Sequence, residues 1–91
     1  MNHRISIIYT AHARKDLLAL DRKVAQRIAL KIQENGNLSN PLIRAKSLSG
    51  NLTGMYCYRI GEYRAIFEID KTGTMVILVI LRIKHRKEVY E

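Results

Sequence analysis

The fold is decided by residues 55–84, which read MYCYRIGEYRAIFEIDKTGTMVILVILRIK. Apolar residues, many of them β-branched or aromatic, alternate here with polar ones in the manner of half-buried strands. Two turn signals divide the stretch, Gly61-Glu62 and Lys71-Thr72-Gly73. We therefore expect three antiparallel strands joined by two tight hairpins.

Alternation gives this predicted sheet one apolar face and one cationic face. The apolar face is expected to hold Tyr56, Tyr58 and Ile60, then Tyr63, Ala65, Phe67 and Ile69, then Val79, Leu81 and Ile83. Arg59, Arg64 and Lys84 fall on the other face, with Arg82 nearby. A slip of one residue would bury these charges, which is costly. We therefore expect the cations to project together from the face that the rest of the chain leaves uncovered.

The preceding residues predict a strand and a helical hairpin that cover the apolar face. Ile5–Tyr9 is short and β-branched, as strands are. Thr10 is placed to cap a helix that runs to about Leu20, and Asp21 to cap a second helix that ends at Asn35-Gly36. The positions expected to face the sheet recur at helical spacing and are Ala13, Leu17 and Leu20, then Val24, Ile28 and Ile32.

Residues 37–54 form the predicted connection between helices and sheet. They contain the only proline and two of the five glycines of the chain. Leu42 and Ile43 are expected to anchor one helical turn there, with Arg44 and Lys46 exposed. The expected fold is thus α+β, in the order β-α-α-β-β-β, with an antiparallel three-stranded C-terminal sheet and a single domain over residues 1–91.

Length and composition limit the cellular setting. The chain has 91 residues, and its longest fully apolar run, residues 75–81, is far shorter than the roughly 20 needed to cross a bilayer. Polar residues interrupt any apolar segment near the start, so no signal peptide is indicated. Cys57 is the only cysteine, which excludes an internal disulfide and leaves no zinc pattern. We expect a cytoplasmic protein without a membrane partner, a metal or another cofactor.

Charge indicates the class of partner. Sixteen Lys and Arg residues stand against eight Asp and Glu residues, which gives a net charge of +8. Such an excess favours a polyanion or an acidic protein, although a basic surface with no specific partner is the alternative. Strand-anchored Arg side chains suit phosphate, and no helix offers an obvious reader of the DNA major groove, so single-stranded RNA is favoured over duplex DNA. Most cations on the helices are expected to form a solvated face; they are Arg14, Lys15, Arg22, Lys23, Arg27 and Lys31.

Residues 48–90 carry a resemblance to a known family. The segments LSGNLTGMYCYRIGEYRAIFEID and VILVILRIKHRKEVY are similar to those of the RelE/ParE toxin superfamily, and specifically of RelE-type mRNA interferases from type II toxin–antitoxin systems. The resemblance implies a toxin that cleaves mRNA in the ribosomal A site and thereby inhibits translation. The implied reaction needs no metal, because the substrate's own 2′-hydroxyl attacks the neighbouring phosphate and leaves a cyclic phosphate.

The resemblance also implies roles for individual residues. Arg64 would stabilise the charged phosphorane, and Lys84 would protonate the leaving oxygen. Tyr90 would orient the 2′-hydroxyl or stack on the nucleotide, although packing of the chain end is the alternative. Arg59 stands where some members have a lysine proposed as the base, but a guanidinium keeps its proton and is a poor base. Cys57 replaces a basic residue common in the family and is expected to be a half-buried strand residue.

Further cations are expected to contact the RNA. The predicted RNA-binding residues are Lys46, Arg82, His85, Arg86 and Lys87. His85 is the only histidine in this part of the chain and is a candidate general base. Its parity in the strand points away from Lys84, so a contact with phosphate is favoured over a role as general base.

The implied partners are a cognate antitoxin, the ribosome with its mRNA, and operator DNA bound through the antitoxin complex. Two other functions stay open from the sequence. One is inhibition of DNA gyrase in the manner of ParE, which shares the fold and the GEYR hairpin but does not need the ending from Lys84 to Tyr90. The other is a homologue without activity that binds only antitoxin and operator DNA.

Overall fold

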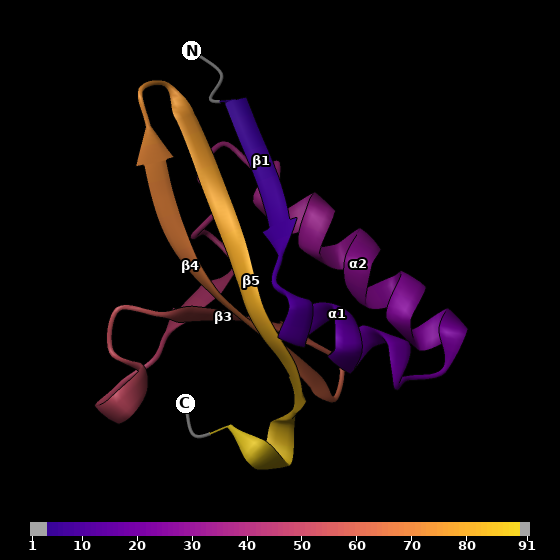
Figure 1. Cartoon of the computed structure of the whole chain (residues 1–91). Coiled ribbons are helices and arrows are strands. Elements are labelled where there is room, and N and C mark those ends of the chain that lie inside the picture. The colour runs from indigo at the N-terminus through magenta and orange to yellow at the C-terminus, as the bar shows by residue number, and fades with distance from the viewer. Residues whose placement is uncertain (1–3, 90–91) are drawn as a thin grey trace.

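The structure, a computed structural model, describes residues 4–89. Its strands are β1 (Arg4–Tyr9), β2 (Ala45–Ser47), β3 (Tyr56–Ile60), β4 (Tyr63–Thr72) and β5 (Met75–His85). Its helices are α1 (Ala11–Leu18) and α2 (Arg22–Gly36), with short 3-10 turns η1 (Gly50–Leu52) and η2 (Arg86–Glu88). Both α-helices lie on the same side of the sheet, and η2 follows the end of β5 (Figure 1). The α+β class and the expected strand–helix–helix order are confirmed.

The sheet is larger than the predicted three-stranded one. It has five strands in the order β1-β5-β4-β3-β2, and β1 pairs with β5 in parallel. The antiparallel pairing of β3, β4 and β5 is confirmed. The prediction missed that β2 and β1 extend this sheet at its two edges. β2 has only three residues and is too short to show a period in the sequence, and the parallel pairing of β1 joins residues about 70 positions apart, as Ile5 and Val76 are.

The main core lies between the helices and the sheet. Ile28, Ile32, Tyr58, Phe67 and Leu78 are completely buried there. Burying large side chains of this kind contributes about 1.5–3 kcal/mol each and holds the helices to the sheet. Every residue predicted to face the sheet from the helices belongs to this core or packs against it.

Both predicted helix caps are present. The hydroxyl of Thr10 accepts a hydrogen bond from the Ala13 amide at 3.1 Å, and the Asp21 carboxylate accepts one from the Lys23 amide at 3.1 Å. The helix ends at Gly36 as predicted, but this glycine is the last helical residue and does not adopt the left-handed conformation expected of a C-terminal cap. Glycine is needed there for packing, since a Cβ atom would lie 2.9 Å from Cδ1 of Leu78.

A bulge in β5 changes the predicted faces of this strand. Phe67 pairs with Ile80 but Ile66 pairs with Arg82, so Leu81 is an additional residue. Ile80 consequently packs with the helices, whereas Leu81 lies in a second apolar cluster on the opposite face. The expectation that Val79 and Leu81 face the helices was wrong, and that for Ile83 is confirmed.

The second cluster lies on the face without helices. It is built from Leu48, Cys57, Ile66 and Val89, with Leu52, Met55 and Leu81 packed against them. In the connection before it, Leu42 and Ile43 lie in a turn rather than in the expected helical turn. No helix within residues 4–89 is long and apolar enough to cross a membrane. This second cluster brings η1 and the chain end over the sheet, where they border the candidate site.

Candidate functional site

Arg59, Arg64 and Lys84 lie in one row across the sheet. Arg59 is the cross-strand partner of Arg64, and Arg64 is the partner of Lys84. Neighbouring strands lie about 4.8 Å apart, so the row crosses about 10 Å of the sheet. All three residues are out of phase with the buried neighbours Ile60, Ala65 and Ile83 on the helix side. The structure thus brings together the three cations that alternation placed on the uncovered face.

The turn beside the row holds the Arg64 guanidinium. Gly61 has a φ of 58°, which a glycine adopts without steric cost. Nη1 of Arg64 donates to the Gly61 carbonyl at 3.0 Å and to the carbonyl of the preceding residue, Tyr63, at 2.9 Å. These two bonds hold the Arg64 guanidinium at the turn between β3 and β4. An anion bound across the row would be attracted by the cations of all three strands.

An apolar groove of about 650 Å³ lies next to the row. Ile66, Leu81 and Val89 line it from the sheet and the chain end, and η1 contributes Leu52. Lys84 lines this groove and also ends the cationic row. Glu88 is the only carboxylate among the described lining residues. The site therefore combines fixed positive charge with an adjacent apolar surface of a size that suits a small organic group.

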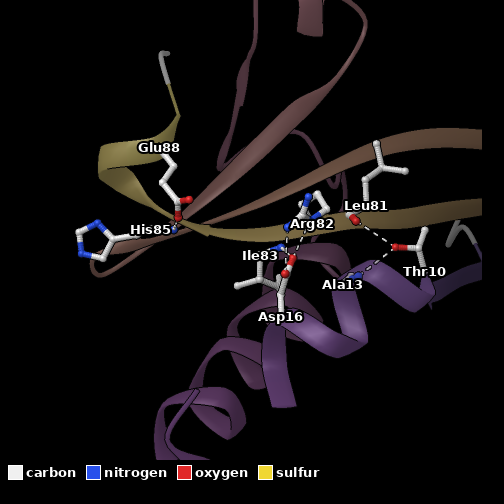
Figure 2. Close-up of polar contacts among 8 residues, drawn as sticks. All are labelled: Thr10, Ala13, Asp16, Leu81, Arg82, Ile83, His85 and Glu88. Atoms are coloured by element: carbon white, nitrogen blue, oxygen red, sulfur yellow. Dashed lines mark hydrogen bonds and ion pairs between the residues drawn. The ribbon is translucent and has the colours of Figure 1, made fainter. Parts of the chain in front are cut away.

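Arg82 is engaged by helix α1. Its Nε donates to Oδ2 of Asp16 at 2.8 Å, and its Nη2 donates to Oδ1 at 3.1 Å (Figure 2). The Ile83 amide also donates to Oδ2 of Asp16, at 2.9 Å. The hydrogen bond from Arg82 is the main cause that lowers the pKa of Asp16, and the same bond raises the pKa of Arg82. Arg82 thus lines the groove with a charge that Asp16 balances.

His85 begins the turn at the end of β5. Its Nδ1 accepts a hydrogen bond from the Lys87 amide at 3.2 Å. The Glu88 carboxylate accepts one from the His85 amide at 3.1 Å (Figure 2). The His85 ring also meets the ring of its strand partner Tyr63 edge-on, at 5.6 Å between centroids. These contacts occupy one imidazole nitrogen and place the ring beside an aromatic residue of the helix side, as its parity predicts.

The remaining predicted RNA contacts lie around the row. Lys46 is exposed in β2 opposite Cys57, which is buried. Arg86 and Lys87 are exposed in η2, and the Arg86 guanidinium lies 3.8 Å from the Glu62 carboxylate. Tyr90 lies outside the described residues. The structure thus gathers Lys46 and the η2 cations at the margins of the cationic row.

The other tyrosines of the sheet are structural. Tyr58 is fully buried, stacks on Phe67 with 4.4 Å between centroids, and donates its hydroxyl proton to the Pro41 carbonyl at 2.8 Å. Burial raises the pKa of Tyr58 to about 12. Tyr56 and Tyr63 pack against the same core. Within residues 4–89 the tyrosines of β3 and β4 therefore face the helices, in agreement with the predicted parity.

The structure has a second cationic surface that the sequence patterns did not predict. Arg27, Lys31, Arg44 and Arg59 line a hollow of about 420 Å³ beside the end of β3. The signal was present in α2, because residues 27 and 31 are one helical turn apart and lie on one face. Arg44 and Arg59 come from distant parts of the chain, so the sequence could not show that they join this pair. Arg59 therefore belongs to both cationic surfaces.

Metal ligands are not gathered in the described part of the chain. Across residues 4–89 no group of three or more His, Cys, Asp or Glu side chains could hold a metal ion.

Comparison with known proteins places the chain among bacterial and archaeal toxins. Residues 7–90 match the family described as the ParE toxin of the type II toxin–antitoxin system parDE. Toxin RelG of Mycobacterium tuberculosis is 38% identical over 88 residues, which cover 93% of this chain and 94% of that protein.

Solved structures show the same fold. The toxin–antitoxin complex RelBE2 of M. tuberculosis contains a chain that is 28% identical, with a TM-score of 0.69 and coverage of 94% of this chain and 93% of that one. The RelB–RelE antitoxin–toxin complex of Methanococcus jannaschii contains a chain that is 26% identical, with a TM-score of 0.60. The match covers 89% of this chain and 92% of that one. Both similarities extend over nearly the whole chain.

Proposed function

We propose that this chain, which belongs to the ParE toxin family of type II toxin–antitoxin systems, is an endoribonuclease that cleaves mRNA on the ribosome. The observation that carries the proposal is the row of Arg59, Arg64 and Lys84 on the face that the helices leave open. A phosphodiester under attack gains negative charge, and preorganised cations stabilise that charge more than the ground state. The resemblance to RelE-type interferases supports the same activity.

The proposed reaction is an attack within the substrate. The ribose 2′-oxygen bonds to the adjacent phosphorus, the bond from phosphorus to the 5′-oxygen breaks, and a 2′,3′-cyclic phosphate and a 5′-hydroxyl result. Arg64 stabilises the pentavalent phosphorane through its planar fork, and Arg59 adds charge beside it. The Lys84 ammonium gives a proton to the leaving 5′-oxygen. Tyr90, outside the described residues, retains its proposed part in orienting the 2′-hydroxyl.

The 2′-hydroxyl proton needs an acceptor, and Glu88 is the proposed one. It lines the groove that Lys84 borders, and its carboxylate can accept a proton, which neither Arg59 nor Arg64 can do. One carboxylate oxygen already accepts from the His85 amide, which holds Glu88 in place. The apolar floor of the groove offers a surface for the ribose and base of the bound nucleotide.

Three partners follow from the proposal. A ribosome-bound mRNA is already held and bent, which supplies the alignment that a site poor in acid and base groups requires. A cognate antitoxin is proposed because the solved relatives include toxin–antitoxin complexes. With a net charge of +8, this toxin favours an acidic antitoxin segment that folds as it binds. Operator DNA would be bound through that complex.

A second candidate function is inhibition of DNA gyrase, which the match to the ParE toxin family favours. Two assays carried out in parallel, of mRNA cleavage and of DNA supercoiling by gyrase, separate the ribonuclease from the gyrase inhibitor. A defined mRNA is translated in a cell-free system with wild-type protein or Arg64→Ala, and breaks are mapped by primer extension. Cleavage at fixed codon positions that the variant lacks is the expected result. Intact mRNA together with inhibited DNA supercoiling would replace the ribonuclease proposal with the gyrase one.

A further inference from the structure

The hollow beside the end of β3 is lined by cations from three segments. Arg27 and Lys31 come from α2, Arg44 directly precedes β2, and Arg59 is the penultimate residue of β3. No carboxylate is among the described residues that line it. Lys31 has an exposed ion pair with Glu34 at 3.3 Å, and such pairs contribute little. The hollow is therefore a concentrated positive charge with room for an anion.

The fold holds these cations in place. β2 pairs with β3 only as far as Tyr58, so the last residues of β3 have no strand on that side. Nη1 of Arg44 donates to Oδ1 of the buried Asn35 at 3.4 Å. The Arg27 guanidinium reaches the β3–β4 turn, since a Cβ atom on Gly61 would lie 3.7 Å from its Nη2. Guanidinium groups oriented in this way can grip phosphate oxygens through two hydrogen bonds.

We propose that the hollow binds a backbone phosphate of the same RNA strand whose scissile phosphate lies at Arg64 and Lys84. This inference rests on the proposed ribonuclease function. Arg59 connects the two surfaces, because it is the partner of Arg64 in the row and also lines the hollow. The RNA track would then run across β5, β4 and β3 and over the sheet edge to α2.

The lining favours RNA over a protein partner. Apart from the stems of its cations, Ile60 is the only large apolar residue among the described ones that line the hollow. Protein interfaces are held chiefly by apolar and aromatic anchors seated in pockets, and the hollow offers little for such an anchor. A nucleic-acid backbone needs none, because phosphate contacts and counterion release supply its affinity.

The test compares two pairs of substitutions with the same loss of charge. Arg27→Gln/Arg44→Gln removes two cations from the hollow, and Arg14→Gln/Arg22→Gln removes two exposed cations elsewhere. The probe is a fluorescent single-stranded oligonucleotide with 2′-O-methyl riboses, which cannot undergo 2′ attack. Binding is measured by anisotropy at several salt concentrations, and thermal unfolding checks that each variant is folded. If Arg44→Gln disturbs Asn35, Arg27→Gln/Lys31→Gln serves as the second hollow variant.

We expect the hollow variant to flatten the plot of log affinity against log salt by about 1.4, or about 0.7 for each lost phosphate contact on a single strand. The control variant should give the same slope as the wild type. Equal slopes for the two pairs would overturn the inference, as would a hollow variant that binds RNA normally but loses an acidic antitoxin peptide. Cleavage of mRNA by the wild type is measured in parallel and tests the ribonuclease proposal separately. If the hollow variant has the flatter slope but the wild type does not cleave mRNA, the phosphate site is retained and the ribonuclease function is rejected.

Discussion

The Asp16 carboxylate receives two hydrogen bonds from the Arg82 guanidinium, at 2.8 and 3.1 Å, and a third from the Ile83 amide at 2.9 Å. β1 pairs with β5 only as far as Ile80, so the following residues of β5 would otherwise have an open edge. Thr10 and Asp16 of the α1 region bond to that edge in place of a strand (Figure 2). Asp16 therefore joins α1 to the strand that carries Lys84.

Replacement of Asp16 should destabilise the fold. We expect Asp16→Ala to lower the free energy of unfolding by about 2 kcal/mol, because it removes a charged acceptor from Arg82 and from the Ile83 amide. Asp16→Asn should lose less, since its carbonyl can still accept one of these bonds. Denaturant titration measures both. The control is Glu34→Gln, whose exposed ion pair with Lys31 should contribute less than about 1 kcal/mol. Equal losses from Asp16→Ala and the control would contradict the role of Asp16.

The same contact should weaken in acid. The hydrogen bond from Arg82 lowers the pKa of Asp16 from its ordinary value of 3.8. A carboxyl with a depressed folded-state pKa contributes stability that is present above the unfolded pKa and is lost as pH falls through the folded one. The stability difference between wild type and Asp16→Asn should therefore be constant near neutrality and shrink below about pH 3.8. A difference that stays unchanged down to pH 2 would exclude this ionisation as the cause.

Local sequence patterns predicted much of the fold and the cationic row of Arg59, Arg64 and Lys84. Thr10 and Asp21 were identified as caps because capping depends on a residue and the amides two or three positions later. The row of Arg59, Arg64 and Lys84 followed from period-two alternation and from the two hairpin turns, which fix strand partners over short separations.

What the sequence did not reveal depends on contacts between distant residues. The bulge at Leu81 leaves no mark in an apolar run, so strict alternation predicts the wrong face for Val79 and Leu81. Asp16 and Arg82 are 66 residues apart, and nothing local in either segment links them. Arg44 joins the cations of α2 only because the connection folds back on that helix. Such placements are set by packing, which no periodicity reports.

Arg64 should be needed for cleavage and not for folding. We expect Arg64→Ala to reduce the rate of mRNA cleavage by roughly 10²- to 10³-fold, as loss of one preorganised donor to a developing charge does in other enzymes. Arg64→Lys should restore only part of the rate, because an ammonium cannot replace the planar fork. The rate is measured by primer extension on translated mRNA. Unchanged antitoxin binding and thermal unfolding are the controls, and full activity of the alanine variant would exclude the proposed role.

Glu88 offers a substitution that separates its structural and chemical parts. Glu88→Gln keeps an oxygen that accepts from the His85 amide but cannot take up a proton. If Glu88 is the general base, this variant should retain thermal stability and RNA binding and lose roughly 10²-fold or more in cleavage. Glu88→Ala should lose the cap as well. A glutamine variant with the wild-type rate and pH profile would leave Glu88 as a cap only.

Alkaline pH should unfold the protein in part through Tyr58. Burial raises its pKa from 10.0 to about 12, and a raised folded-state pKa contributes stability that is complete below the unfolded pKa and lost as pH rises through the folded one. The free energy of unfolding should therefore fall between about pH 10 and pH 12. Tyr58→Phe should cost about 1 kcal/mol at neutral pH, because the Pro41 carbonyl loses its donor, and should reduce the alkaline loss. Burial also raises the pKa of Tyr9. The variant that combines Tyr9→Phe with Tyr58→Phe should therefore show a still smaller loss of unfolding free energy at alkaline pH. The same loss in wild type and in both variants would contradict the role of these tyrosines.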